Sequence, residues 1–294
     1  MTIAYEIQRL IDAKAAIKAA IERKGVEVGD GPLLSYYPNY IDKIAVGDGE
    51  FYRTITNNGT DYSYLFYMII EPSRIPDVST WDVSNAQYMD SMFYACANTT
   101  SLDLSNWYAP NLSNASHMFD SCQQLQYLDL SNFYTSSITD MSYMFYSCQS
   151  LYELNLSNWY TGNVTNMNGM FTYCYSLQSI YGELDLSNLS DGFYPNYDKA
   201  PFRGCSSLYW LELKYIYSNC SMDNDSKWTI DLGDTMVCDD CLRNIINELP
   251  DLYNDKGLSE TDQIILVLPT SNGLYDGDVQ PAIDKGWTVT NTNF

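Results

Sequence analysis

Acidic side chains recur at equivalent places in this sequence, and arrays of carboxylate oxygens are the kind of ligand that binds calcium. The acidic residues Asp103, Asp129, Asp185 and Glu212 stand between the leucines of candidate strands, and Asn155 occupies the equivalent place in its strand. Neighbouring strands lie about 4.8 Å apart, so like charges in such a column repel one another. We expect either a solvated acidic face or, as the sharper alternative, a divalent-cation site.

Catalytic residues are scarce. The chain has a single histidine, His117, so a Ser-His-Asp or Cys-His centre could use no other. Cys238 and Cys241 have the spacing of a redox or zinc pair, but no second pair accompanies them, and Asp239 and Asp240 between them would raise the thiol pKa. We expect no enzyme, and no cofactor unless the acidic face binds calcium.

The charge balance excludes two classes of partner. The 294 residues carry a formal net charge of -22, and no Lys or Arg occurs between Ile75 and Asp198. Nucleic acids and anionic membranes both require a basic surface. The chain also has no run of 18 apolar residues, and the stretch after Met1 lacks a charged segment followed by an apolar one. We expect a protein made in a host cytoplasm and released on a particle.

An interval of 26 residues organises the middle of the chain. Several columns keep this step: Met92, Met118, Met144 and Met170; Phe93, Phe119, Phe145 and Phe171; Cys96, Cys122, Cys148 and Cys174; Trp81, Trp107, Phe133 and Trp159. This period falls in the range of leucine-rich repeats, whose units bury their apolar faces only by stacking. The sequence therefore predicts an α/β repeat solenoid of 26-residue units.

The spacing of apolar residues predicts a short helix and a strand in each unit. Met141, Met144, Phe145 and Cys148 stand at i, i+3, i+4 and i+7, which is a helical stripe. Thr139 precedes that stripe, and its hydroxyl could accept a free backbone N–H. Residues 125–130 and 151–156 then alternate with leucines inward, as a strand does. The repeat cysteines are expected to be reduced core residues.

The repeats resemble the BspA-like leucine-rich repeats of bacterial surface proteins. The residues that carry the resemblance are Asn163-Val-Thr-Asn-Met-Asn-Gly-Met-Phe171 and Leu154-Asn-Leu-Ser-Asn-Trp159, and it extends over Ile75 to Leu213. The commoner leucine-rich consensus has an asparagine where this chain has Trp107, Phe133 or Trp159, so an aromatic corner replaces a polar one. The resemblance implies a non-enzymatic surface protein.

Residues 2–24 are predicted to form the clearest long helix in the sequence. Apolar residues and one lysine step through it by four and three, the spacing of a coiled-coil seam. The seam consists of Ile3, Ile7, Leu10, Lys14, Ile17 and Ile21. Isoleucine at both seam positions favours three strands, so we expect a homo-oligomer, with a trimer favoured. A single amphipathic helix packed on its own solenoid is the alternative.

The N-terminal segment also resembles a short module of virion fibre proteins from phages of gut Bacteroidales, crAss-like phages included. Its pattern is Ala13 to Glu22, followed by Lys24-Gly-Val26 and Val28-Gly-Asp-Gly31. The resemblance implies attachment to a virion and contact with other virion proteins. We therefore expect the protein on the virion surface.

The chain divides into four parts. Residues 1–46 are expected to form the helical anchor, and residues 50–74 a β-hairpin cap that doubles as a degenerate first repeat. Residues 75–232 should form the leucine-rich repeat solenoid, and residues 233–294 divergent closing repeats and a cap. Within the last part, alternation predicts strands at 263–268 and 287–289 and helices at 238–249 and 278–285.

The candidate binding surface combines the acidic column with aromatic residues. Its members are Asp103, Asp129, Asp185, Glu212, Tyr127, Glu153, Trp210, Tyr108, Tyr134 and Tyr160. Tyrosine offers rigid contact area and a hydroxyl for hydrogen bonding, and the chain has 27 of them. We expect a phage head or tail fibre or appendage that adheres to host or mucus glycan or protein. A bacterial cell-surface adhesin lacking its export signal is the alternative.

Overall fold

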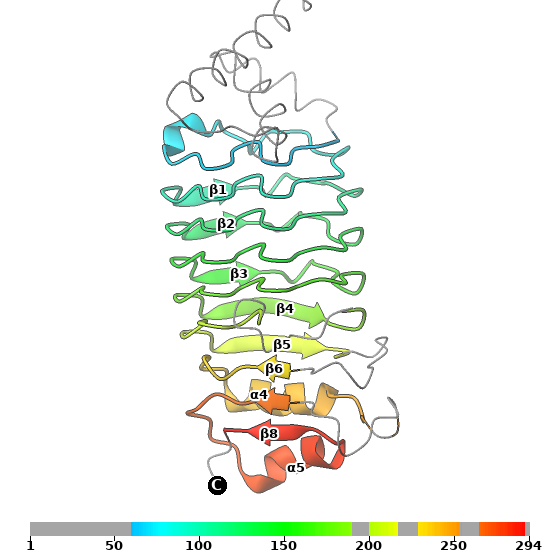
Figure 1. The fold of residues 1–294 in the computed structure, drawn as a ribbon. Helices are drawn as coiled ribbons and strands as arrows, with labels where there is room; N and C mark the ends of the chain where they lie inside the picture. The colour runs from blue at the N-terminus through cyan, green and yellow to red at the C-terminus, as the bar shows by residue number, and fades with distance from the viewer. Residues whose placement is uncertain (1–59, 190–199, 217–228, 253, 255–264, 292–294) are drawn as a thin grey trace, which may run out of the picture. The chain divides into compact units, whose positions relative to one another are not determined.

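The computed structural model describes residues 60–189, 200–216, 229–252, 254 and 265–291. These residues form a β-solenoid of about six turns. Figure 1 shows strands β1 (Ser101–Asp103), β2 (Tyr127–Asp129), β3 (Glu153–Asn155), β4 (Ser179–Asp185) and β5 (Trp210–Lys214) stacked in chain order. The predicted repeat solenoid is confirmed. The expected N-terminal helix and its seam residues lie outside the described residues.

Parallel strands line one side of the turns. β1 pairs with β2, and β3, β4 and β5 form a second ladder, with one strand contributed by each turn. In β1 the central residue Leu102 is buried between two exposed neighbours, and β3 repeats this pattern with Leu154. The alternation predicted from the leucines is confirmed, because strand side chains point to opposite faces in turn.

The predicted helix in each repeat is wrong. Residues 142–147 form consecutive turns in place of a helix, and the backbone enters the left-handed region at Tyr143 (φ 55°) and Ser147 (φ 57°). One left-handed residue in every four returns buried side chains to the same face at i, i+3, i+4 and i+7. That spacing equals the spacing of a helical stripe, so over eight residues the two structures share one apolar pattern.

Backbone hydrogen bonds in these turn segments run from one turn to the next. The N–H groups of Met89, Ser91, Phe93 and Ala95 donate to the carbonyls of Asn114, Ser116, Met118 and Asp120 at 2.7–3.1 Å. An α-helix would have satisfied these groups internally. Here every such N–H points towards the following turn, and the arrangement repeats along the stack.

Three side-chain columns fill the core. The Phe66, Phe93, Phe119, Phe145, Phe171 and Phe202 rings stack, with neighbouring centroids 5.2–5.8 Å apart. Beside them each repeat cysteine donates its thiol to the phenylalanine carbonyl of the preceding turn, as Cys122 does to Phe93 at 3.1 Å. The repeat cysteines are free and buried, as predicted. Trp107, in the third column, donates its indole N–H to the Val78 carbonyl at 2.8 Å.

The hydroxyls that precede each turn segment act as donors. The hydroxyl of Ser113 donates to the Gln87 carbonyl, that of Thr139 to the Ser113 carbonyl and that of Thr165 to the Thr139 carbonyl, at 3.0–3.3 Å. The predicted helix cap, in which Thr139 would accept an N–H, is therefore wrong. Without a helix there is no free N-terminal turn to cap, and the hydroxyls join successive turns instead.

The first described turn carries the start of the phenylalanine stack. Residues 60–74 are the described part of the expected hairpin. Residues 63–68 form turns, and the rings of Phe66 and Phe93 stack with centroids 5.2 Å apart. A short 3-10 helix, η1 (Pro72–Arg74), follows where later turns lead into a strand. No helix among the described residues has the length and apolar character needed to span a bilayer.

The closing units use α-helices. They contain β6 (Thr229–Asp231), α4 (Asp239–Glu248), β7 (Ile265–Val267), α5 (Asp276–Asp284) and β8 (Thr288–Thr290), and these three strands form a separate parallel sheet. The predicted strands and helices of this part are confirmed. The direction of these strands was not predicted. In Figure 1 the arrows of β6 and β8 point opposite to those of β4 and β5.

Helix α4 takes the place beside β5 that a further strand would occupy. At one end the Cys238 N–H donates to the Tyr209 carbonyl at 2.9 Å. At the other end Lys214 of β5 forms an ion pair with Glu248 of α4 at 3.1 Å. The helix thus lies along the last strand of the β3–β5 ladder and covers its edge, which would otherwise present unpaired backbone groups.

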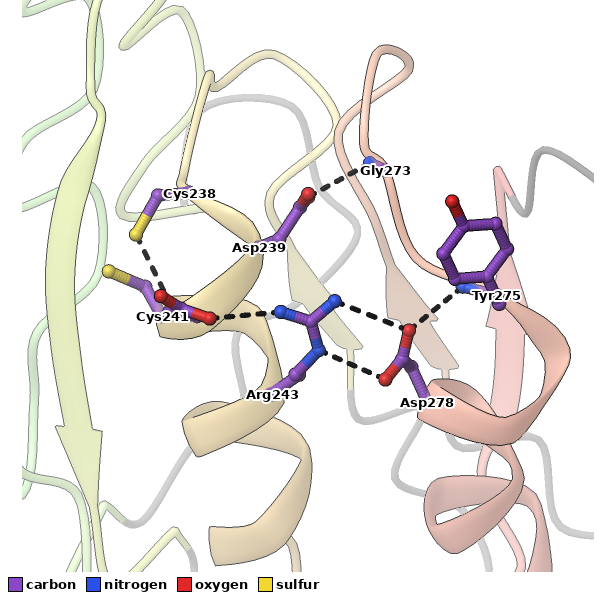
Figure 2. Close-up of polar contacts among 8 residues, drawn as sticks. Cys238, Asp239, Cys241, Arg243, Gly273, Tyr275 and Asp278 are labelled. Carbon is purple, nitrogen blue, oxygen red and sulfur yellow. Dashed lines mark hydrogen bonds and ion pairs between the residues drawn. The ribbon is translucent and has the colours of Figure 1, made fainter.

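Helices α4 and α5 are joined by polar contacts, shown in Figure 2. Arg243 of α4 forms ion pairs with Asp278 of α5 and with Asp240, both at 2.9 Å. The carboxylate of Asp239 accepts the Gly273 N–H at 2.8 Å. Because Arg243 is the hydrogen-bond donor to Asp278, it lowers the pKa of that carboxyl.

Candidate binding surface

The outer face of the sheet presents two columns of side chains. Ser101 lies beside Tyr127 in one column, and Asp103 lies beside Asp129 in the other. The register of the next ladder continues this order, with Glu153 beside Ser179 and Asn155 beside Tyr181. Side chains on these rungs are held at the strand spacing by the backbone ladder, so the face is a rigid, regular surface.

Exposed aromatic side chains cover much of this face. Tyr127 is 59 % exposed and Trp210 is 38 % exposed, which confirms their predicted outward orientation. Three further exposed tyrosines lie on or next to the strands: Tyr152, Tyr181 and Tyr209. Tyr152 and Tyr209 directly precede β3 and β5. The signal for them was present in the sequence, because Tyr152 and Tyr209 stand two residues before the strand leucines Leu154 and Leu211, and Tyr181 follows the buried Ile180.

The tyrosines that follow the corner aromatics form a separate strip. Tyr108, Tyr134 and Tyr160 are all exposed, and the rings of Tyr108 and Tyr134 lie 5.6 Å apart. They belong to the segment after the corner and not to the strands. The predicted set of surface residues therefore divides into a sheet face and a strip beyond one corner.

Asp185 does not stand beside Asn155 as predicted. Tyr181 occupies that rung, and Asp185 pairs with Lys214 of β5 after an irregularity in β4. Gly182 makes the irregularity feasible, because its φ is 105° and an added Cβ would lie 2.6 Å from the Leu156 carbonyl carbon. Ser179 to Glu183 in β4 spans four residues where Trp210 to Glu212 in β5 spans two, so the two extra residues shift the acidic column out of register here.

The acidic column has a structural use. Asp103, Asp129 and Asp185 each accept the N–H of the serine two residues ahead, at 2.9–3.0 Å, and Asn155 does the same at 3.1 Å. Such turns are a common reason for aspartate and asparagine at a corner. Across the described ranges, no three acidic, cysteine or histidine side chains converge on a point where a metal ion would bind. Local turn formation is one role of the carboxylates in this column.

Hydrogen bonds set the electrostatics of the column. Those from Ser105 lower the pKa of Asp103, while the nearby carboxylate of Asp77 acts in the opposite direction. The charge of Asp129 raises the pKa of Tyr127, whose hydroxyl lies 3.4 Å from that carboxylate. The sheet face is therefore anionic at neutral pH, and it disfavours anionic ligands.

An asparagine ladder runs along the same corner, one residue before the corner aromatic. Asn106 donates to the Ser79 carbonyl at 3.2 Å, and Asn158 to the Ser131 carbonyl at 3.0 Å; Asn132 donates in the same way to Ser105. The sequence predicted that an aromatic corner replaces the polar corner of the leucine-rich consensus, and it did not predict this ladder. The polar ladder is retained, but on the exposed side of the corner.

The residues considered for catalysis make contacts within the fold. His117 stacks on Tyr143 at 4.7 Å, and its Nδ1 lies 2.7 Å from the Asp120 carboxylate. Cys238 precedes α4, and its sulfur accepts the Cys241 N–H at 3.3 Å, as a helix cap does. Burial raises the pKa of Cys241 to about 12, which keeps the thiol protonated at neutral pH.

Comparisons with known proteins agree with the repeat structure. Residues 55–128 and 96–197 match the family described as "Mycoplasma protein of unknown function, DUF285". Neither a curated protein nor a solved structure matches the chain. The matched residues include β1 to β4 and the turn segments between them. The match and the stacked turns together fit a BspA-like repeat protein.

Proposed function

We propose that this chain is a non-enzymatic phage virion structural protein, a head or tail fibre or appendage. Its solenoid displays an adhesion surface for glycan or protein on the host or in mucus. The observation that carries the adhesion part is the exposed aromatic sheet face, with Tyr127 and Trp210 on its rungs. Exposed aromatic side chains on a rigid scaffold bind at low conformational cost, because little freedom remains to be lost.

The chemistry of the surface narrows the ligand. The region between Ile75 and Asp198 has no lysine or arginine, so the turns up to β4 offer neither of these cations to a sulfate or carboxylate group. On β5 the cation of Lys214 forms an ion pair with Glu248. Neutral sugars and uncharged or basic protein segments are the ligands that this face favours. Support for the virion assignment comes from the resemblance of residues 13–31 to a phage module.

A binding experiment tests the adhesion part. The full chain and its Trp210→Ala variant are compared on immobilised mucin by surface plasmon resonance, and mucin stripped of its glycans separates sugar from protein recognition. Loss of one aromatic anchor is expected to weaken binding by about tenfold or more, since such anchors contribute on the order of 2 kcal/mol. Tyr275→Ala is the matched control, because that tyrosine is 75 % exposed at the start of α5. Equal binding by all three proteins would contradict the proposal.

The virion part needs a separate test. Antibodies against the protein are expected to decorate phage particles in electron micrographs, and its gene is expected among capsid and tail genes. Light scattering of the full chain and of a chain lacking residues 1–45 tests the proposed trimer. A folded monomer after deletion supports assembly through that segment, whereas equal masses contradict it.

A bacterial cell-surface adhesin is the second candidate. The description of the matched family as a Mycoplasma protein favours it. Recovery of the protein from a bacterial envelope fraction, together with a gene far from virion genes, would select this candidate over the phage appendage. The sheet-face experiment applies to both candidates, since both use the same surface.

A further inference from the structure

A small cleft lies at the start of the β1–β2 sheet, away from the aromatic residues of β3 to β5. It has a volume of about 240 Å³ and is formed between the segment after η1 and the residues that lead into β1. Pro72, Ile75 and Pro76 form one wall, and Thr99 and Thr100 belong to the other. This volume is below the usual range for drug-sized ligands, so the cleft suits a single small ring.

The cleft exists where one turn departs from the repeat. Thr99 occupies the place that later turns give to a fully buried leucine: Leu125, Leu151, Leu177 and Leu208. The backbone N–H of Thr99 donates to the Cys96 carbonyl at 3.0 Å, and that of Leu125 donates to Cys122 in the same way. The backbone is therefore unchanged, and the difference lies in the side chain alone.

Thr99 contributes a buried polar group to this cleft. The residue is 4 % exposed, and its hydroxyl oxygen has no hydrogen-bond partner among the described residues. Leaving a buried hydroxyl unpaired costs free energy that the repeat's leucine would avoid. A ligand hydroxyl in the cleft would satisfy it.

Two carboxylates stand at the exposed rim. Asp77 and Asp103 both line the cleft, and each uses its Oδ1 to accept the N–H of the serine two residues ahead, at 3.0 Å. These bonds fix both carboxylates in place. Asp77 also accepts the Ser79 hydroxyl at 2.6 Å on the same oxygen. A carboxylate has two oxygens with about four lone-pair sites, so both side chains can accept further hydrogen bonds from a ligand.

We propose that this cleft binds one terminal, non-anionic sugar ring of a glycan. The hydroxyl of Thr99 at the floor and the carboxylates of Asp77 and Asp103 at the rim hydrogen-bond the sugar hydroxyls, and the proline wall packs against the C–H face of the ring. The carboxylates reject uronic and sialic acids by charge. The inference deepens the proposed adhesion function by naming a ligand class and a second site.

Saturation-transfer NMR on the full chain tests the inference. The probes are the methyl glycosides of glucose, galactose, mannose and N-acetylglucosamine, with glucuronic acid as the anionic comparison. At least one neutral probe is expected to receive saturation, and glucuronic acid none. The absence of transfer to every neutral probe, or equal transfer to glucuronic acid, overturns the proposal.

Variants locate the site. Thr99→Leu restores the residue of the other turns and fills the cleft, so it is expected to abolish the signal while the melting temperature stays the same or rises. Thr99→Val keeps the shape but removes the hydroxyl, and it is expected to weaken binding by about tenfold, the equivalent of one hydrogen bond. Unchanged binding in Thr99→Leu overturns the proposal.

Trp210→Ala separates this site from the sheet face. Because Trp210 lies on β5, that variant is expected to bind the monosaccharide normally even where it loses mucin binding. Loss of monosaccharide binding in Trp210→Ala would place the sugar on the sheet face and overturn the cleft assignment. Retained sugar binding with unaltered mucin binding would contradict the sheet-face function alone.

Discussion

The central turns and the closing units build a solenoid in two different ways. In the turns, side chains such as Phe93 are brought into register by backbone hydrogen bonds that leave one turn for the next. In the closing units, α4 and α5 satisfy their backbones internally and meet through side chains such as Arg243 and Asp278. The central turns therefore need a fixed spacing within each turn segment, whereas the interval between segments can change: Phe171 and Phe202 are 31 residues apart and still stack at 5.8 Å.

The difference appears in the core as well. Each turn places one phenylalanine in a stack whose interior neighbours are 5.6 Å apart and almost parallel, at 6–7°. In α4 the buried residues Leu242, Ile245 and Ile246 follow helical spacing instead. Substituting a phenylalanine of the stack thus removes contacts in both neighbouring turns. Substituting a buried residue of α4 is expected to disturb mainly the packing of that helix.

The largest expected effect is from Phe119→Ala, in the middle of the stack. Removing this fully buried ring takes away stacking on Phe93 and on Phe145, and the free energy of unfolding is expected to fall by about 3–5 kcal/mol. Hydrogen exchange is expected to accelerate in the turn segments on both sides. Chemical denaturation and exchange mass spectrometry measure the two effects.

Tyr134→Ala is the control, because its side chain is 43 % exposed and the expected change is within about 0.5 kcal/mol. Leu242→Ala in α4 sharpens the comparison. It is expected to increase exchange in the closing units and to leave residues 115–148 protected. Equal propagation from Leu242 and Phe119 would show that the two regions form one cooperative unit.

Acid is expected to loosen the contact between α4 and α5. The hydrogen bond from Arg243 lowers the pKa of Asp278 below its usual value of 3.8. A carboxyl whose pKa is lowered by folding contributes stability above its unfolded pKa, and that contribution disappears as the pH falls through the folded value. Protection factors in α5 should therefore decrease as the pH falls below about 3.8. Arg243→Ala should show the same decrease already at neutral pH, and normal protection in this variant would refute the assigned cause.

The smallest expected effect concerns the left-handed residues of the turns. Ala95 has a φ of 54°, where an L-residue is strained and glycine is not. Ala95→Gly is expected to raise the free energy of unfolding by about 0.5–1 kcal/mol, after the greater entropy of glycine in the unfolded chain is subtracted. Gly169→Ala, at a φ of 61°, is the reverse experiment and should destabilise by a similar amount. Thermal denaturation of both variants tests this pair.

The strands were predictable because their signal is two-fold alternation around leucines such as Leu102 and Leu154, which no other structure shares. The turn segments were not, since eight residues are too few to separate a four-residue period from a helical one. Glycine at the left-handed positions would have made them visible in the sequence. In the described turn segments, only Gly169 and Gly204 are glycines at such positions, whereas Ala95, His117 and Tyr143 are residues that do not indicate a positive φ.

The candidate surface was predictable in part. The outward orientation of Tyr127 and Trp210 followed from the same alternation. The register of Asp185 did not, because the irregularity in β4 depends on the close approach of Gly182 to the neighbouring strand. The cleft at Thr99 was missed although its signal, a threonine in a leucine column, was present in the sequence. The sequence does not show that a cleft is present there, because the cleft depends on where the segment after η1 lies relative to Thr99.

The hydrogen bonds that Ser91, Phe93 and Ala95 and their equivalents donate to the following turn give these columns of the stack an electrical polarity. Bonds in the opposite direction, such as those from Ser113 to Gln87 and from Thr139 to Ser113, offset it in part. Peptide dipoles that point the same way along several columns add together, as they do in a helix, and their N–H ends make one face of the stack electropositive. That end meets Asp234, whose carboxylate accepts the Gly204 N–H at 3.2 Å. A strongly acidic chain therefore places one of its carboxylates at the site where its own backbone attracts an anion.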